Sequence, residues 1–79
     1  MARKVKDGDG TLGDQIRRAR VAAGLTQVQL AERLGVAQPN VSAIERGDRP
    51  TIQTLIRLAD VLGADFSYDG RRVTFARRK

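Results

Sequence analysis

The 79-residue sequence predicts a single, mainly α-helical domain of four short helices followed by a C-terminal β-hairpin. From residue 11 to residue 63, apolar residues recur at spacings of three and four, which is typical of amphipathic helices. From Phe66 to Phe75, apolar and polar residues alternate around Asp69-Gly70, a dipeptide that favours a tight hairpin turn. A chain of this length is near the lower limit for a self-sufficient core, so we expect one domain.

Capping residues delimit the first two helices. Thr11 can act as the N-cap of the first helix, which is expected to end at Gly24. Thr26 and Gln29 stand three residues apart and form a capping box. The second helix therefore begins there and runs to about Leu34.

The third helix is expected from about Gln38 to Arg46, with Pro39 in its first turn, where the missing N–H does little harm. Thr51 caps the fourth helix, which ends before Gly63. This last helix carries a wider apolar surface than one face of a small domain requires. Two interpretations remain open: it is a well-buried core helix, or it also packs, through Leu58 and Val61, against the C-terminal segment or a second subunit.

The alternating segment predicts the register of the hairpin. A two-residue turn at Asp69-Gly70 would pair Phe66 with Val73. Tyr68 and Phe75 would then share their face. The opposite face would carry Asp65, Ser67, Arg72 and Thr74. An isolated hairpin is only marginally stable in water, so this one must pack on the fourth helix or on a partner.

Charge and composition exclude several classes of function. The net charge is +6 and the pI is about 11.1, above the value of about 9 that suggests a nucleic-acid partner, although ordinary solubility is the alternative. The absence of Cys and His excludes disulfides, thiol or imidazole catalysis and zinc-finger-type sites. No signal peptide is visible, and no apolar run approaches the ~18 residues that span a membrane. We therefore expect a cytoplasmic protein that binds no membrane, metal or cofactor.

Residues 1–10 lack periodicity and are expected to form a flexible basic arm. One interpretation is an unstructured terminus. The other is that Arg3, Lys4 and Lys6 contact the phosphates of a polyanion.

The segment from Gln27 to Ile44 predicts two short helices joined by a tight turn. Gly35 lies where the chain must turn sharply, and glycine accepts a positive φ at little cost. Ala31 lies where the two helices would cross closely, and a larger side chain would push them apart. The second helix of the pair begins with small polar residues. This arrangement is typical of a helix-turn-helix that reads DNA.

Residues 11–63 resemble the Cro/C1-type (XRE-type) helix-turn-helix of phage repressors and bacterial regulators, a lambda repressor-like fold. In this family the third helix lies in the major groove of DNA and the second crosses the backbone. The resemblance covers about two thirds of the chain. The matching motifs are Gly24-Leu25-Thr26-Gln27, Leu30-Ala31, Leu34-Gly35-Val36, Val41-Ser42, Ile44-Glu45-Arg46-Gly47, Leu58-Ala59 and Leu62-Gly63.

The resemblance implies a role for individual residues. Gln38 corresponds to a residue that reads adenine, and a carboxamide can pair with both N6 and N7 of that base. Gln27 corresponds to a glutamine that binds a phosphate and braces Gln38. Arg46 and Arg49 correspond to the loop that follows the phosphate backbone. The remaining positions implied to contact bases are Pro39, Asn40, Ser42 and Ala43.

Arg20 and Glu45 both lie on apolar stripes, since Arg20 follows Ile16 by four residues and Glu45 follows Val41 by four. A charge in such a position is costly unless it is paired. We expect the two side chains to form a structural ion pair, as the matching residues of the family do.

The leading hypothesis is a transcriptional regulator, a repressor, that binds a palindromic operator in double-stranded DNA as a homodimer. The alternative is an antitoxin that neutralises a toxin protein through its terminal segments and autoregulates its operon. An enzyme is disfavoured, because no pair of carboxylates lies in a recognisable catalytic motif.

Residues 64–79, the hairpin and a basic tail, are expected to form the dimerisation element. The hairpin is the one apolar feature that the helix-turn-helix does not need, and its apolar face would be exposed on a monomer. Two such faces or edges could meet across a twofold axis. The residues assigned to this interface are Phe66, Tyr68, Val73 and Phe75, with Leu58 and Val61 as the alternative.

Overall fold

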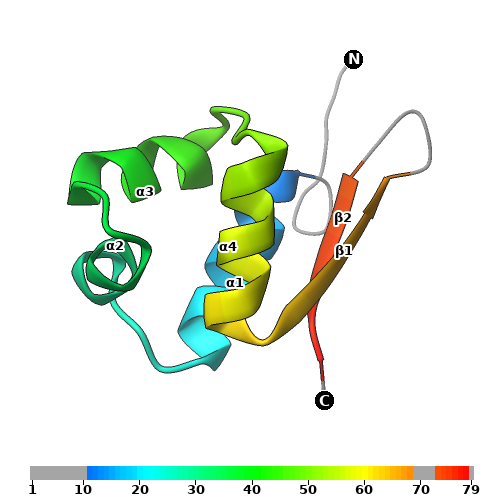
Figure 1. Ribbon diagram of the computed structural model, residues 1–79, viewed down its shortest axis with the longest axis horizontal. Coiled ribbons are helices and arrows are strands. Elements are labelled where there is room, and N and C mark those ends of the chain that lie inside the picture. The colour runs from blue at the N-terminus through cyan, green and yellow to red at the C-terminus, as the bar shows by residue number, and fades with distance from the viewer. Residues whose placement is uncertain (1–10, 69–72, 79) are drawn as a thin grey trace.

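The computed structural model describes residues 11–68 and 73–78 and contains four α-helices and one antiparallel hairpin (Figure 1). The elements are α1 (Leu12–Ala22), α2 (Gln27–Leu34), α3 (Gln38–Arg46), α4 (Ile52–Leu62), β1 (Ala64–Tyr68) and β2 (Val73–Arg77). The predicted fold class is therefore confirmed. The basic arm, with Arg3, Lys4 and Lys6, lies outside the described residues.

Three of the four helices begin at a threonine N-cap. The Thr11 hydroxyl accepts a hydrogen bond from the Asp14 N–H, and both halves of the capping box between Thr26 and Gln29 are present. Thr51 caps α4 in the same way. The exception is α3, whose N-cap residue, Ala37, offers no side-chain acceptor. This helix must be held by its tertiary contacts.

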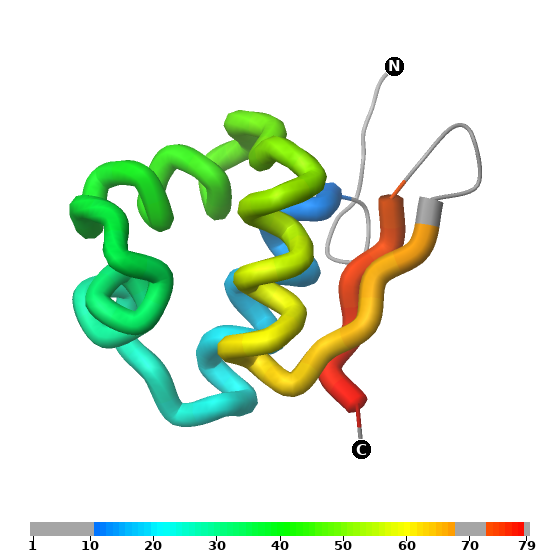
Figure 2. Tube along the Cα trace, viewed as in Figure 1, coloured from blue at the N-terminus to red at the C-terminus, as the bar shows by residue number. Residues whose placement is uncertain are grey.

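Helix α4 lies at the centre of the molecule, with α2 and α3 on one side and the hairpin on the other (Figure 1). In the trace of Figure 2, β1 and β2 run together along the side of α1 and α4 that faces away from α2 and α3. The largest fully buried side chains come from all four helices, which makes one continuous core. They are Ile16, Leu30, Val41, Leu55, Leu58 and Leu62.

The hairpin has a different register from the predicted one. Phe66 pairs with Phe75, and Tyr68 pairs with Val73, so four residues connect the strands. The predicted two-residue turn at Asp69-Gly70 is thus wrong, although those residues and Arg72 lie outside the described part of the chain. A shift of two residues leaves each side chain on the same face, so the sorting of apolar from polar residues within the strands survives.

The observed register lets β2 bind the ends of two helices. The Arg77 guanidinium donates to the carbonyl of Leu62 at the end of α4 and to the carbonyl of Ala22 at the end of α1, both at 3.2 Å. Carbonyls in the last turn of a helix lack partners within the helix, and a cation there is favourable. The backbone N–H of Phe75 also donates to Gln15 Oε1 on α1, at 2.6 Å. Packing and these hydrogen bonds therefore outweigh the local turn preference.

The apolar face of the hairpin packs against the helical core of its own chain. Phe75 is only 3% exposed and Leu58 only 1%, so the prediction that these two residues contact a second subunit is wrong. The hairpin completes a core that four short helices leave open on one side. Phe66, Val73 and Val61 are partly buried against the same core, and the side chain of Tyr68 lies outside what the structure describes.

Gly13 allows α1 to approach the end of α3 more closely than any other residue would. A Cβ atom placed on Gly13 would lie 2.7 Å from the carbonyl oxygens of both Ile44 and Glu45. Such distances are shorter than van der Waals contact, and backbone atoms cannot rotate away as a flexible side chain can. This requirement could not be predicted from the sequence, because a glycine in the first turn of a helix carries no local signal of what it contacts.

Gly13→Ala should destabilise the fold by about 1–3 kcal/mol, because α1 and α3 must move apart to admit the methyl group. Urea unfolding followed by circular dichroism measures this. Arg17→Ala, at an exposed position of the same helix, is the control and should change the free energy of unfolding by less than about 0.5 kcal/mol. A Gly13→Ala protein as stable as the wild type would show that the close approach is not a constraint.

Candidate nucleic-acid interface

The turn between α2 and α3 fixes the angle between these helices. Gly35 ends α2 in the left-handed conformation, with φ of 74°, and the Val36 N–H donates to the Ala31 carbonyl at 3.0 Å. Leu34 and Val41 are buried on either side of this turn. The residue that the sequence required to be glycine thus has the backbone conformation that glycine favours.

Helix α3 lies at the edge of the molecule and turns one face inward and the other outward (Figure 1). Val41 and Glu45 are buried on the inner face. Pro39, Asn40 and Arg46 are exposed, whereas Gln38, Ser42 and Ala43 are partly exposed. Every residue that the sequence analysis assigned to base contact is accordingly at least partly accessible on α3.

Arg46 and Arg49 follow this face toward α4. The Arg46 Nη1 donates to the Ser42 hydroxyl at 2.9 Å, which holds the guanidinium along the exposed side of the helix. Arg49 is exposed in the loop before α4 and lines a shallow groove of about 270 Å³ together with Val36, Asn40 and Ala43. The groove joins the start of α3 to the loop that follows it.

Arg20 and Glu45 form a buried ion pair between α1 and α3. Arg20 Nε donates to Glu45 Oε2 at 2.7 Å, and Arg20 Nη2 donates to Oε1 at 3.2 Å. The Glu45 side chain is 3% exposed and that of Arg20 is 13% exposed. A third guanidinium contact, from Nη1 to the Leu25 carbonyl at 2.8 Å, ties the pair to the loop before α2. One guanidinium thus links three segments of the chain.

The ion pair continues into a line of hydrogen bonds that ends at the surface. Gln27 Nε2 donates to Glu45 Oε1 at 3.0 Å, and Gln38 Nε2 donates to Gln27 Oε1 at 2.7 Å. The contact between the two glutamines was expected only from the family resemblance. The contact between Gln27 and Glu45 was not predicted, because these residues are 18 positions apart and share no local pattern.

Within residues 11–68 and 73–78, no group of three or more acidic residues lies close enough to hold a metal ion. None of the helices in this part of the chain is long and apolar enough to cross a membrane.

Comparison with known proteins assigns the family. The model of a helix-turn-helix family matches residues 16–68, which include α2, the turn and α3. The chain belongs to the Cro/C1-type helix-turn-helix family.

Members of this family with a similar sequence include curated and structurally solved proteins. The HTH-type transcriptional regulator y4dJ of Sinorhizobium fredii, itself uncharacterized, is 43% identical over 53 residues, covering 66% of this chain and 69% of that protein. A solved structure of SinR, a master regulator for biofilm formation in complex with DNA, is 38% identical with a TM-score of 0.59, covering 63% of this chain and 82% of that one.

The similarity in fold extends beyond the helix-turn-helix. A chain in the HipA–HipB–O2–O3 complex superposes with a TM-score of 0.62 and covers 90% of this chain and 100% of that one, at 22% identity. This likeness concerns the fold alone. The chain spans 18%, 69% and 46% of the lengths of three curated relatives, all of them HTH-type transcriptional regulators or regulatory proteins by name.

Glu45→Ala should destabilise the protein by about 3–5 kcal/mol, because it leaves the Arg20 guanidinium buried without a counterion. Chemical denaturation measures this loss. The matched control is Asp65→Ala, which removes the partner of Arg78 from an ion pair that is mostly exposed. That change should cost less than about 1 kcal/mol. Equal losses in the two variants would mean that burial does not make the Arg20–Glu45 pair important.

Proposed function

We propose that this protein is a sequence-specific regulator of transcription that places α3 in the major groove of double-stranded DNA. The observation that carries this proposal is the outer face of α3, where accessible small and polar side chains surround a carboxamide whose position is fixed by hydrogen bonds. An α-helix fits the major groove, and only residues on such a face can reach base edges. The family and the DNA complex of SinR support the same conclusion.

Each residue of this face suits a particular contact. Gln38 and Asn40 carry carboxamides, which can pair with N6 and N7 of adenine. Pro39 and Ala43 offer apolar surface, which suits the methyl group of thymine. Ser42 can donate to a base or a phosphate. Three of these residues are in the first turn of α3, where recognition helices approach the bases.

Contacts to phosphates would surround this face. Gln27, at the N-terminus of α2, lies where backbone N–H groups and the helix dipole favour an anion. Arg46 and Arg49 are exposed at the other end of α3. Lys4 and Lys6 are assigned to phosphates by their charge alone. Together with a net charge of +6, these groups support an affinity for DNA that falls as salt releases counterions.

Gln38→Ala should reduce affinity for the preferred site by about 1–3 kcal/mol and relax the preference at one base pair. The loss follows from removing a bidentate contact to a base edge. Fluorescence anisotropy with the preferred site and its single-base variants measures both effects. The control is Arg49→Ala, which should weaken binding to all sequences alike. If Gln38→Ala also weakens all sequences alike, Gln38 is a backbone contact and does not read a base.

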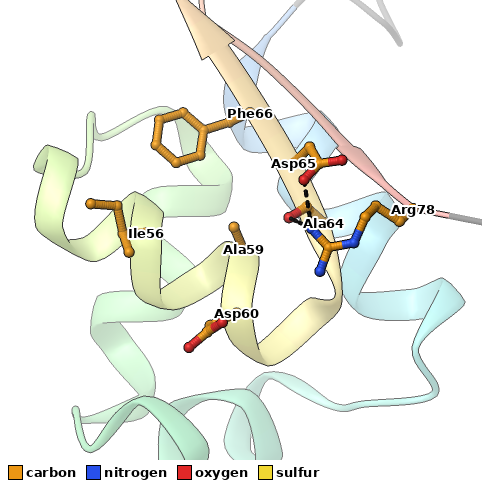
Figure 3. Close-up of a pocket in the computed structure, with 7 residues that line it drawn as sticks. All are labelled: Ile56, Ala59, Asp60, Ala64, Asp65, Phe66 and Arg78. Carbon is orange, nitrogen blue, oxygen red and sulfur yellow. Dashed lines mark hydrogen bonds and ion pairs between the residues drawn. The ribbon is translucent and has the colours of Figure 1, made fainter.

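A homodimer reading a palindrome needs a second surface, and the outer side of α4 and β1 is the best candidate. Ile52 and Ile56 of α4 are 60% and 54% exposed. Ile56 borders a groove of about 260 Å³ whose apolar lining includes Ala59 and Phe66 (Figure 3). Ile52, Ile56, Ala59 and Phe66 make up this α4–β1 face. Exposed apolar groups in one patch favour burial against a partner.

Charge and backbone geometry favour a second copy of the chain as that partner. Asp60, Asp65 and Arg78 border the groove, so the patch carries both signs and can complement itself across a twofold axis (Figure 3). The N–H of Phe75 points away from β1, toward Gln15. In an antiparallel ladder, the N–H and C=O of its partner Phe66 then also point outward, where they can pair with β1 of a second protomer. The outward carbonyl of Ala64, at the start of β1, is already bound by Arg78.

Ile56→Asp should give a folded monomer that binds a palindromic site at least about tenfold more weakly, because the two half-sites are no longer bound cooperatively. Sedimentation equilibrium and circular dichroism measure assembly and folding. Val21→Asp is the control, because Val21 is similarly exposed, at 59%, but lies on α1 and not on the α4–β1 face. A dimer that persists in Ile56→Asp, or a wild type that is monomeric at all concentrations, would remove this face as the interface.

A further inference from the structure

We infer that Glu45, a buried carboxylate that cannot touch DNA, determines which hydrogen-bonding atoms Gln38 presents to a base. Glu45 thereby acts as a positioning residue for base preference. This inference rests on the proposed function, since it assumes that Gln38 reads a base. The choice of base would then depend on an ion pair on the inner face of α3.

The direction of the hydrogen bonds begins at the ion pair. An ionised carboxylate has only acceptors, and both oxygens of Glu45 already accept from Arg20. Gln27 can therefore meet Glu45 Oε1 only with its Nε2. The amide of Gln27 cannot turn over without bringing its own oxygen against a buried anion, which would lose a hydrogen bond and add a repulsion.

The orientation of the Gln27 amide in turn fixes that of the Gln38 amide. With Nε2 of Gln27 committed to Glu45, its Oε1 lies 2.7 Å from Gln38 and can only accept. Gln38 must consequently donate one of its two N–H groups inward. The polarity of the surface carboxamide is thus set by a chain of three hydrogen-bonding side chains that starts at a charge.

This polarity leaves Gln38 with one N–H and the oxygen Oε1 for DNA. Adenine offers N7 as an acceptor and its N6 amino group as a donor, so this edge of the carboxamide matches it. Guanine offers two acceptors, N7 and O6, and would oppose the glutamine oxygen. If the carboxamide turned over, its oxygen would face Gln27 and both N–H groups would face outward, which suits guanine. Glu45 therefore favours adenine over guanine at this position.

Two variants separate this directional role from simple stabilisation. Glu45→Gln keeps the shape of the side chain but can donate as well as accept, so the amides of Gln27 and Gln38 are free to turn over. Arg20→Lys weakens the ion pair and removes the bond to the Leu25 carbonyl, but it leaves the carboxylate in place. We expect both variants to be less stable than the wild type. Only Glu45→Gln should lose the fixed direction of the hydrogen bonds that run from Gln38 through Gln27 to residue 45.

The measured quantity is the ratio of affinities for the preferred site and for the same site with guanine in place of adenine at the base pair that Gln38→Ala affects. The wild type and Arg20→Lys should discriminate by roughly 5- to 100-fold, as a good bidentate contact does. Glu45→Gln should bring the ratio to within about threefold of unity. If Glu45→Gln is not folded at the assay temperature, the double variant Arg20→Met/Glu45→Gln, which buries no unpaired charge, replaces it.

Unchanged discrimination in folded Glu45→Gln overturns the inference and leaves the proposed function intact. If no base pair in the wild-type site responds to Gln38→Ala, the reading role of Gln38 itself fails. A direct test needs no substitution: NMR on the free wild-type protein should detect a scalar coupling across the hydrogen bond from Gln38 Nε2 to the side-chain carbonyl carbon of Gln27. A coupling in the reverse direction, from Gln27 Nε2 to the Gln38 carbonyl carbon, would contradict the inference.

Discussion

The buried ion pair between Arg20 and Glu45 links α1, α3 and the loop before α2. It joins α1 to α3 in the interior, where a single charge would be strongly destabilising. The same guanidinium holds the loop before α2 through the Leu25 carbonyl, and the same carboxylate holds Gln27 at the start of α2. Helix α3 has no side-chain N-cap, so these contacts supply the orientation that its own sequence does not.

The remaining architecture brings α1 and α3 close enough for that pair to form and keeps water away from it. Because Gly13 has no side chain, α1 can lie directly against the backbone at the end of α3. On the opposite side, Phe75 fills the space beside α1 and α4, and Arg77 binds the carbonyls at the ends of both helices. A chain of 79 residues has little apolar area to bury, so a hairpin that completes the core contributes a large share of its stability.

Local signals in the sequence were sufficient to predict the helices and strands. The features that were not predicted depend on contacts between residues far apart in the chain. The threonine caps, the capping box at Thr26 and the apolar spacing predicted all four helices, because each depends on residues within one or two turns. The Asp69-Gly70 signal predicted a hairpin but the wrong register, since the burial of Phe75 and the contacts of Arg77 are stronger than a turn preference. For the candidate site, the residues on α3 could be chosen from the motif. The need for glycine at position 13 and the hydrogen bond from Gln27 to Glu45 could not be predicted, because both depend on how α1, α2 and α3 pack.

Under the proposed function, this packing presents α3 to the major groove once from each subunit of a homodimer. Selection of bound duplexes from a random library by the wild-type protein is the most informative experiment. We expect enrichment of a palindrome whose half-sites are about 10 base pairs apart from centre to centre, with adenine at one fixed position in each half. Retention of duplexes without any enriched sequence would contradict the proposed function, because the protein would then bind phosphates without reading bases.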